Sequence, residues 1–169
     1  MSKAQLKKEL AAMDAVQLRE LILDVYSARK EAKDYFEFFL NPDVTKLTEK
    51  TEAAIRKELN RTKRGRLCAR FSKINTWLKE YESFGIDADH VYNLMYQTWS
   101  TAVELEHQFY CQAAFVNGTV RLMTRMLEFA DKHQLFNVAI VQIDSVISTA
   151  SRSLRTPMRE ALASFKTTI

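Results

Sequence analysis

Hydrophobic residues recur at intervals of three and four along nearly the whole chain, the spacing that gathers side chains on one face of an α-helix. The clearest stripe covers residues 18–39. It predicts one long amphipathic helix, capped by Asp14 and ended by Asn41-Pro42, because proline cannot continue a helix. A short helix is expected before it, with Ser2 as its N-cap. Residues 35–40 are mostly aromatic or leucine on more than one helix face, which indicates extensive packing and points to oligomerisation.

Later stripes predict six more helices, over residues 43–59, 67–84, 87–109, 120–130 and 138–154, and from Thr156-Pro157 to the C-terminus. Gly85 suits the end of its helix, and Thr156-Pro157 suits the N-cap and first position of the last one. Residues 60–66 have no apolar period and contain a glycine, so they predict a loop. Asn117-Gly118 is interpreted either as a turn or as a weak point tolerated within a helix.

Seven or eight helices with short connections and no strand pattern predict an all-α protein. Each helix has one apolar face, so several must pack together to bury it. We expect a single domain over residues 1–169, folded as an irregular bundle of helical hairpins. The alternative is a short α-solenoid, although no internal repeat of ~33–47 residues is evident.

The amino-acid composition excludes several fold classes and cellular locations. The chain of 169 residues contains only 3 Gly and 2 Pro, too few for the many tight turns of a β-sandwich or barrel. No uninterrupted run of ~18 apolar residues occurs, so we expect no membrane association. The N-terminus lacks the apolar core of a secretory signal. We therefore expect a cytoplasmic protein in which Cys68 and Cys111 are free thiols.

Several local patterns, taken in order, resemble a known family. They are LKKEL at 6–10, LRELILDVY at 18–26, EAKDYF at 31–36, FFLNP at 38–42, the basic residues 61–66, and FGID at 84–87. Over about residues 3–150 the chain resembles a bacterial family of small helical proteins known only as a domain of unknown function. The resemblance implies a bacterial, cytoplasmic, all-helical protein and assigns no catalytic residue. Residues after Thr156 extend beyond the family pattern.

The net charge of +4 conceals a strong segregation of charge. Residues 1–60 carry 11 basic and 11 acidic side chains, whereas residues 61–80 carry 7 basic and 1 acidic. No Lys or Arg occurs over residues 81–120, a stretch that contains five carboxylates. Residues 61–73, the basic segment, are therefore the candidate site for nucleic acid or another anion. Its candidate residues are Arg61, Lys63, Arg64, Arg66, Arg70 and Lys73.

The basic segment has more than one interpretation. Phosphate contact is one, and each phosphate neutralised would add about −0.9 to the log–log salt dependence of B-DNA binding. The segment also suits a solvated loop, contact with a protein partner, or pairing with the acidic residues 82–106 within one chain or across a dimer. No helix-turn-helix or RNA-binding motif accompanies it.

Glu104, His107 and Cys111 are weak candidates for metal ligands. The Glu-x-x-His spacing places a carboxylate and an imidazole on one helix face, but di-iron bundles use it twice and this chain has it once. His107 and Cys111, four residues apart, could share a metal or form a thiolate–imidazole pair. A closed zinc site needs four ligands, and the other candidates lie on different predicted helices. We therefore expect no metal and no cofactor.

Catalytic motifs are missing from the sequence. It contains no phosphate-binding glycine loop, no dinucleotide fingerprint and no serine-hydrolase elbow. We predict no catalytic residues and favour a non-enzymatic protein-protein interaction module that acts with a protein partner or as a homo-oligomer. The alternative is an electrostatic nucleic-acid-binding protein that uses the basic segment.

Overall fold

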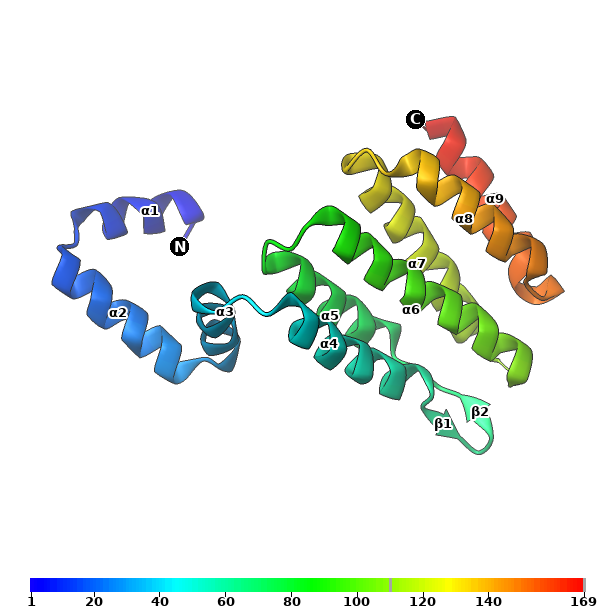
Figure 1. The fold of residues 1–169 in the computed structure, drawn as a ribbon, viewed down its shortest axis with the longest axis horizontal. Helices are drawn as coiled ribbons and strands as arrows, with labels where there is room; N and C mark the ends of the chain where they lie inside the picture. Colours follow the sequence, from blue (N-terminus) through cyan, green and yellow to red (C-terminus); the bar gives the residue numbers. More distant parts are fainter. Residues whose placement is uncertain (110, 169) are drawn as a thin grey trace. The chain divides into compact units, whose positions relative to one another are not determined.

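The computed structural model describes residues 1–109 and 111–168. Within them the chain forms nine helices and one short two-stranded hairpin (Figure 1). The all-α prediction is confirmed, and the predicted count of seven to eight helices is one or two too low for the described residues. The chain divides into two compact units, unit 1 at Met1–Asp43 and unit 2 at Val44–Ile169.

Unit 1 contains α1 (Lys3–Ala12), α2 (Ala15–Ala28) and α3 (Lys30–Leu40). The predicted caps are confirmed. The Ser2 hydroxyl accepts a hydrogen bond from the Gln5 backbone N–H at 3.2 Å. Asp14 and Gln17 exchange side-chain and backbone hydrogen bonds as a capping box. These local bonds separate α1 from α2 where the sequence predicts.

The prediction of one long helix over residues 18–39 is wrong. The helix is broken at Arg29, whose backbone is extended with φ −132° and ψ 117°. Neither glycine nor proline marks the break, so local preference does not explain it. The break lets α3 fold back against α2, where the Tyr26 hydroxyl donates to Glu37 Oε1 at 3.2 Å. Contacts between the two helices, among them this polar one, therefore accompany a break that the helical preference of a single residue does not predict.

Unit 2 consists of three helical hairpins. They are α4 (Val44–Leu59) with α5 (Phe71–Ser83), α6 (Ala88–Gln108) with α7 (Ala113–Lys132), and α8 (Phe136–Thr149) with α9 (Arg152–Thr168). In Figure 1, α4, α6 and α8 form one layer and α5, α7 and α9 the other. Successive hairpins start at intervals of about 45 residues, as in two-helix solenoid repeats. Hairpins were expected, but their layered order is that of the predicted alternative, a short α-solenoid.

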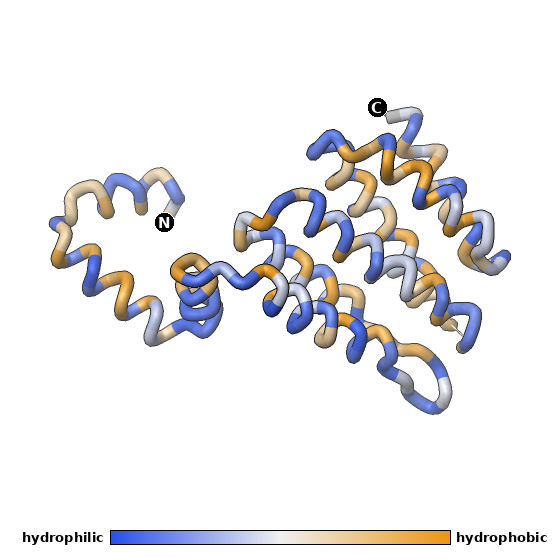
Figure 2. The backbone as a smooth tube through the Cα atoms, in the orientation of Figure 1, coloured by the Kyte–Doolittle hydropathy of each residue, from blue (hydrophilic) through white to orange (hydrophobic). Residues whose placement is uncertain are grey.

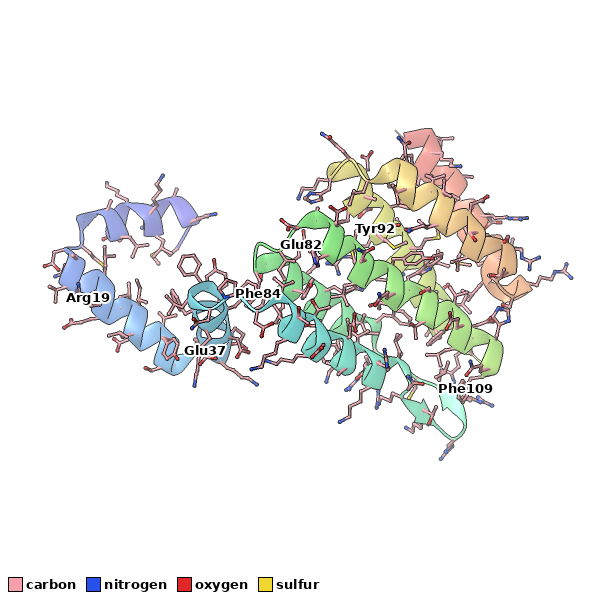
Figure 3. All side chains as sticks on the ribbon, viewed as in Figure 1. Arg19, Glu37, Glu82, Phe84, Tyr92 and Phe109 are labelled. Carbon is pink, nitrogen blue, oxygen red and sulfur yellow. The ribbon has the colours of Figure 1, made fainter. Side chains whose placement is uncertain are left out.

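The core lies entirely within unit 2, because every buried hydrophobic side chain among the described residues falls between Ile55 and Leu162. The aromatic residues of α6, which share one helix face, supply much of it: Tyr92 is 3% exposed and Trp99 is fully buried. The Tyr92 hydroxyl donates to Gln142 Oε1 of α8 at 2.7 Å (Figure 3). None of the described helices combines the length and the hydropathy that crossing a bilayer requires.

Asn117-Gly118 lies in the middle of α7, so the interpretation as a turn is wrong. Gly118 is buried, and a Cβ at this position would overlap the ring of Phe71 at the start of α5. The same ring packs edge-on against Phe115, with ring centroids 5.3 Å apart. The glycine is therefore a close-contact point between α5 and α7.

The last helix starts earlier than predicted. The chain breaks between α8 and α9 at Ala150-Ser151, and Pro157 lies inside α9 instead of opening it. Leu154, Met158 and Leu162 are all buried and follow one another at intervals of four. Burial of this stripe on a single helix therefore outweighs the local preference for proline at a helix start.

Candidate functional site

The basic segment forms a β-hairpin at its centre, where the sequence predicted a loop. Strands β1 (Thr62–Lys63) and β2 (Arg66–Leu67) pair antiparallel, with Lys63 opposite Arg66. The turn residues Arg64 and Gly65 both have positive φ, 52° and 73°, as a two-residue type I′ turn requires. Positive φ costs a non-glycine residue ~1–2 kcal/mol, so the fold holds Arg64 at the tip against its own preference.

The hairpin is anchored to unit 2 at its base. Leu67 is 1% exposed and forms a parallel bridge with Cys111 in the connection between α6 and α7. The Cys68 backbone N–H donates to the Arg61 carbonyl at 2.8 Å and closes the base. Phe109, the C-cap of α6, marks this end of the unit in Figure 3. The turn is therefore held in place although its side chains are exposed.

Glu58 of α4 neutralises part of the basic segment. Its carboxylate is only 6% exposed and accepts two side-chain hydrogen bonds from Arg70, at 2.8 and 2.7 Å, and one from the Arg70 backbone at 3.1 Å. Arg61 Nη1 lies 3.9 Å from the same carboxylate. The hydrogen bonds from Arg70 lower the pKa of Glu58 from 4.5 to about 2, against the opposing effect of burial. Arg70 is therefore a structural cation.

The other cations of the basic segment lie elsewhere. Lys63, Arg64 and Arg66 are exposed on the hairpin, and Lys73 is exposed in the first turn of α5. Arg61 is exposed as well, but its guanidinium also donates to the Cys68 carbonyl at 3.3 Å. The three cations of the hairpin are therefore set apart from Arg61 and Arg70, which lie beside Glu58.

A concavity of about 420 Å³ lies beside the hairpin. Its described lining residues are Lys63, Arg64, Arg66, Leu67, Cys68 and Gln112. None of these is acidic. Gln112 is the N-cap of α7, a helix of 20 residues, and its side chain makes no capping hydrogen bond. The partial positive charge of that helix N-terminus therefore adds to the three cations. We name this feature the hairpin concavity.

Arg61 and Arg70 of the basic segment pair with Glu58 and not with the acidic residues 82–106. Glu82, at the end of α5, lies 3.5 Å from Arg125 Nη2 of α7 (Figure 3). Glu106 accepts a hydrogen bond from the Ser153 hydroxyl of α9. The carboxylate that compensates the basic segment is Glu58. Sequence reasoning missed it because only the folded hairpin brings Arg70 back to α4.

The weak metal candidates do not assemble into a ligand set. Glu104 and His107 are exposed on α6, but that helix ends at Gln108, so Cys111 does not share their face. Among the described residues, no group of three or more His, Cys, Asp or Glu side chains is placed to hold a metal. Burial and the nearby Glu106 raise the pKa of Cys111 to about 11, so it is a neutral thiol at pH 7. Both cysteines are free, as predicted.

Unit 1 carries a second candidate surface. None of its residues is buried, although hydrophobic residues recur between hydrophilic ones along α2 and α3 (Figure 2). Fourteen large hydrophobic side chains are exposed among the described residues, and eleven of them lie in unit 1. We use the name apolar surface of α2 and α3 for the set of their exposed large hydrophobic side chains, which are Val16, Leu21, Ile22, Leu23, Val25, Tyr35, Phe39 and Leu40. Phe39 and Leu40 are the most exposed of these, at 68% and 71%.

Polar contacts hold α2 and α3 together around this surface. Glu37 accepts the hydrogen bond from Tyr26 and lies 3.8 Å from Lys33 Nζ (Figure 3). Lys33 Nζ is also 5.9 Å from the centre of the Tyr26 ring. Tyr35 and Phe39 stack at 6.5 Å on the same helix. The helix pair is therefore ordered by contacts that leave its apolar side chains 37% to 71% exposed.

Comparison with known proteins agrees with the resemblance seen in the sequence. No curated protein and no solved structure matches the chain. The match to a family model runs through both units and stops within the first turn of α9, near the predicted limit of the family pattern. Over residues 1–155 the chain matches, and therefore belongs to, DUF6155, a family of unknown function.

Proposed function

We propose that this protein acts by protein–protein contact, without catalysis, through the apolar surface of α2 and α3. One observation carries the proposal: unit 1 has no buried residue and yet holds eleven of the fourteen large hydrophobic side chains that are exposed in the described part of the chain. A segment of ~40 residues without a core is stable only with outside support. Burying a fully exposed side chain of this kind contributes ~1.5–3 kcal/mol, and these side chains, which are 37% to 71% exposed, each offer part of that toward the cost of association.

The occupant that suits this surface is an apolar helix face of another polypeptide. Residues 1–43 carry 7 basic and 8 acidic side chains, so the unit has almost no net charge. Charge therefore gives no preference for a strongly acidic or basic partner, and the energy of binding must come from apolar burial. A second copy of the chain and a different protein both meet this requirement.

The test uses the double variant Phe39→Glu/Leu40→Glu in the full chain. Its control is Lys30→Glu, which makes the same two-unit charge change at an exposed site of α3. Sedimentation velocity from ~1 to ~100 µM reports self-association, and capture from a lysate of the source organism reports a different partner.

We expect the parent chain and Lys30→Glu to associate with the same species, and the double variant to lose about tenfold or more in affinity. The proposal would be contradicted if the parent chain, Lys30→Glu and the double variant were all monomeric at ~100 µM and captured the same set of proteins.

Nucleic-acid binding through the basic segment is the second candidate. The observation that favours it is the exposure of Lys63, Arg64 and Arg66 on one hairpin. Three phosphate contacts would give a log–log salt slope of about −2.7 on B-DNA. Fluorescence anisotropy with a labelled duplex at ~50 and ~200 mM salt measures that slope. An absence of binding at the lower salt concentration would remove this candidate.

A further inference from the structure

We propose that the hairpin concavity binds the phosphate group of a small molecule. The inference does not depend on the apolar surface of α2 and α3. It starts from the convergence of Lys63, Arg64 and Arg66 on one concavity of about 420 Å³. Cavities of ~300–1,000 Å³ are typical of small-molecule sites, so the space exceeds that of a phosphate group alone and admits the molecule that carries it.

The chemistry of the lining suits phosphate. The Arg64 guanidinium presents forked donors that match the oxygen atoms of phosphate, and Lys63 and Arg66 add two further positive charges to the lining. Gln112 contributes an amide and stands at the N-terminus of α7, where the helix dipole also favours an anion. With no acidic residue among the described lining residues, nothing there repels a dianion.

The fold keeps the neutralising carboxylate away from the concavity. Glu58 pairs with Arg70 and Arg61, and it is not part of the lining. Arg64 stays at the tip with a φ of 52°, a conformation in which asparagine or glycine would cost less. An arginine therefore lies beside the concavity at a cost in local stability. Such strain is typical of ligand-binding positions.

The same observations favour a small ligand over a nucleic-acid strand. A strand needs a row of cations or stacking aromatic side chains that follows its backbone. Here the three cations surround one space, while Arg70 is held by Glu58 and Lys73 does not line the concavity. This arrangement favours one phosphate group in the concavity over the three separate contacts of the nucleic-acid candidate, and the DNA arm of the experiment distinguishes the two.

The experiment is isothermal titration calorimetry on the full chain with adenosine 5′-monophosphate, adenosine, inorganic phosphate and a single-stranded 20-mer DNA. The variants are Arg64→Asn and Lys73→Gln. Arg64→Asn removes the charge but supplies the Asn-Gly pair that type I′ turns prefer, so the hairpin is preserved or strengthened. Lys73→Gln makes the same charge change in the basic segment but outside the concavity.

We expect the monophosphate to bind and adenosine not to bind. We also expect Arg64→Asn to lower the affinity for the monophosphate by about tenfold. Lys73→Gln should change that affinity by less than about twofold. Inorganic phosphate that binds as tightly as the monophosphate would support the site and assign it to free phosphate. Inorganic phosphate that binds more weakly than the monophosphate would also support the site and assign it to a phosphate ester.

Four results would overturn the proposal. The first is equal binding of adenosine and its monophosphate. The second is equal weakening by Arg64→Asn and Lys73→Gln, since that indicates general charge attraction. The third is failure of both phosphate probes to bind at ~10 mM. The fourth is binding of the 20-mer DNA more than about 100-fold tighter than the monophosphate, with affinity lost in Lys73→Gln. None of these results bears on the apolar surface of unit 1, whose test uses other variants.

Discussion

Glu58 places a negative charge where its side chain is almost fully covered, and Arg70 supplies the compensating hydrogen bonds. Replacing this residue by glutamine would keep the shape of the side chain but remove the charge that pairs with Arg70. We expect Glu58→Gln to lower Tm by roughly 2–5 °C at pH 7. Thermal unfolding followed by circular dichroism measures the change, with Glu52→Gln on the same helix as the control.

The effect of Glu58→Gln should depend on pH in a defined direction. The pKa of Glu58 is lowered in the folded chain to about 2, from 4.5. Such a group stabilises the fold fully above pH 4.5, and the contribution is lost as the pH falls from 4.5 through 2. The difference in Tm between parent and variant should therefore shrink over this range. A difference that stays constant or grows down to pH 2 would contradict this assignment.

Gly118 is the residue at which helix propensity and packing oppose each other. Alanine is favoured over glycine in a helix by ~1 kcal/mol, but a Cβ here would overlap the Phe71 ring. We expect Gly118→Ala to destabilise the chain by about 1–3 kcal/mol in urea unfolding. In a Phe71→Ala background the same change should become neutral or stabilising. An effect of the same sign in both backgrounds would show that the ring is not the cause.

At the scale of elements, α9 gives the sharpest contrast between sequence and structure. If Thr156-Pro157 opened the helix, Thr156→Ala would remove an N-cap and cost ~1 kcal/mol. In the structure both residues lie within α9, where proline forfeits a backbone hydrogen bond. We therefore expect Pro157→Ala to raise Tm by roughly 2–5 °C and Thr156→Ala to leave it unchanged or slightly higher. If calorimetry showed that Pro157→Ala lowers Tm and Thr156→Ala lowers it too, the last helix would start at Thr156-Pro157 as the sequence predicted.

Elements governed by short-range bonds could be predicted from the sequence, and those governed by packing could not. The caps at Ser2 and Asp14 and the helix end at Gly85 lie where predicted, because neighbouring backbone groups determine them. The break at Arg29 carries no such signal, and Gly65 marks a loop without indicating the paired strands on either side of it. The solenoid order was hidden too, because the three hairpins have helices of unequal length and so show no repeat.

The same division applies to the candidate site. Charge counting located the cations of the basic segment, since composition alone shows where they are. It could not show that Arg70 returns to Glu58 or that Gln112, from a distant connection, lines the same concavity. Both facts depend on contacts between residues far apart in the chain, which a single sequence does not reveal.

At the scale of the whole molecule, stability is distributed unevenly between the two units. In the described part of the chain, all buried hydrophobic residues lie between Ile55 and Leu162, and unit 1 has none. A segment without a core has no cooperative transition of its own. The prediction of a single domain over residues 1–169 stays a prediction, and we expect it to appear as one calorimetric transition, which unit 2 supplies. Two resolved transitions would contradict this prediction.

Hydrogen exchange connects this uneven stability with the proposed function. Amides open by local unfolding where few apolar contacts resist it, so α2 and α3 should exchange much faster than α6 and α7 in a dilute sample of the full chain. Covering the apolar surface of α2 and α3 with another polypeptide would slow that exchange, because opening would then also require dissociation.

If a second copy of the chain covers this surface, protection of α2 and α3 should rise with protein concentration while that of α6 and α7 stays constant. Mass spectrometry of the exchanged peptides at two protein concentrations measures this directly. Full protection of α2 and α3 in the dilute sample would mean that the surface is already covered, and protein–protein contact would then lose the surface proposed for it.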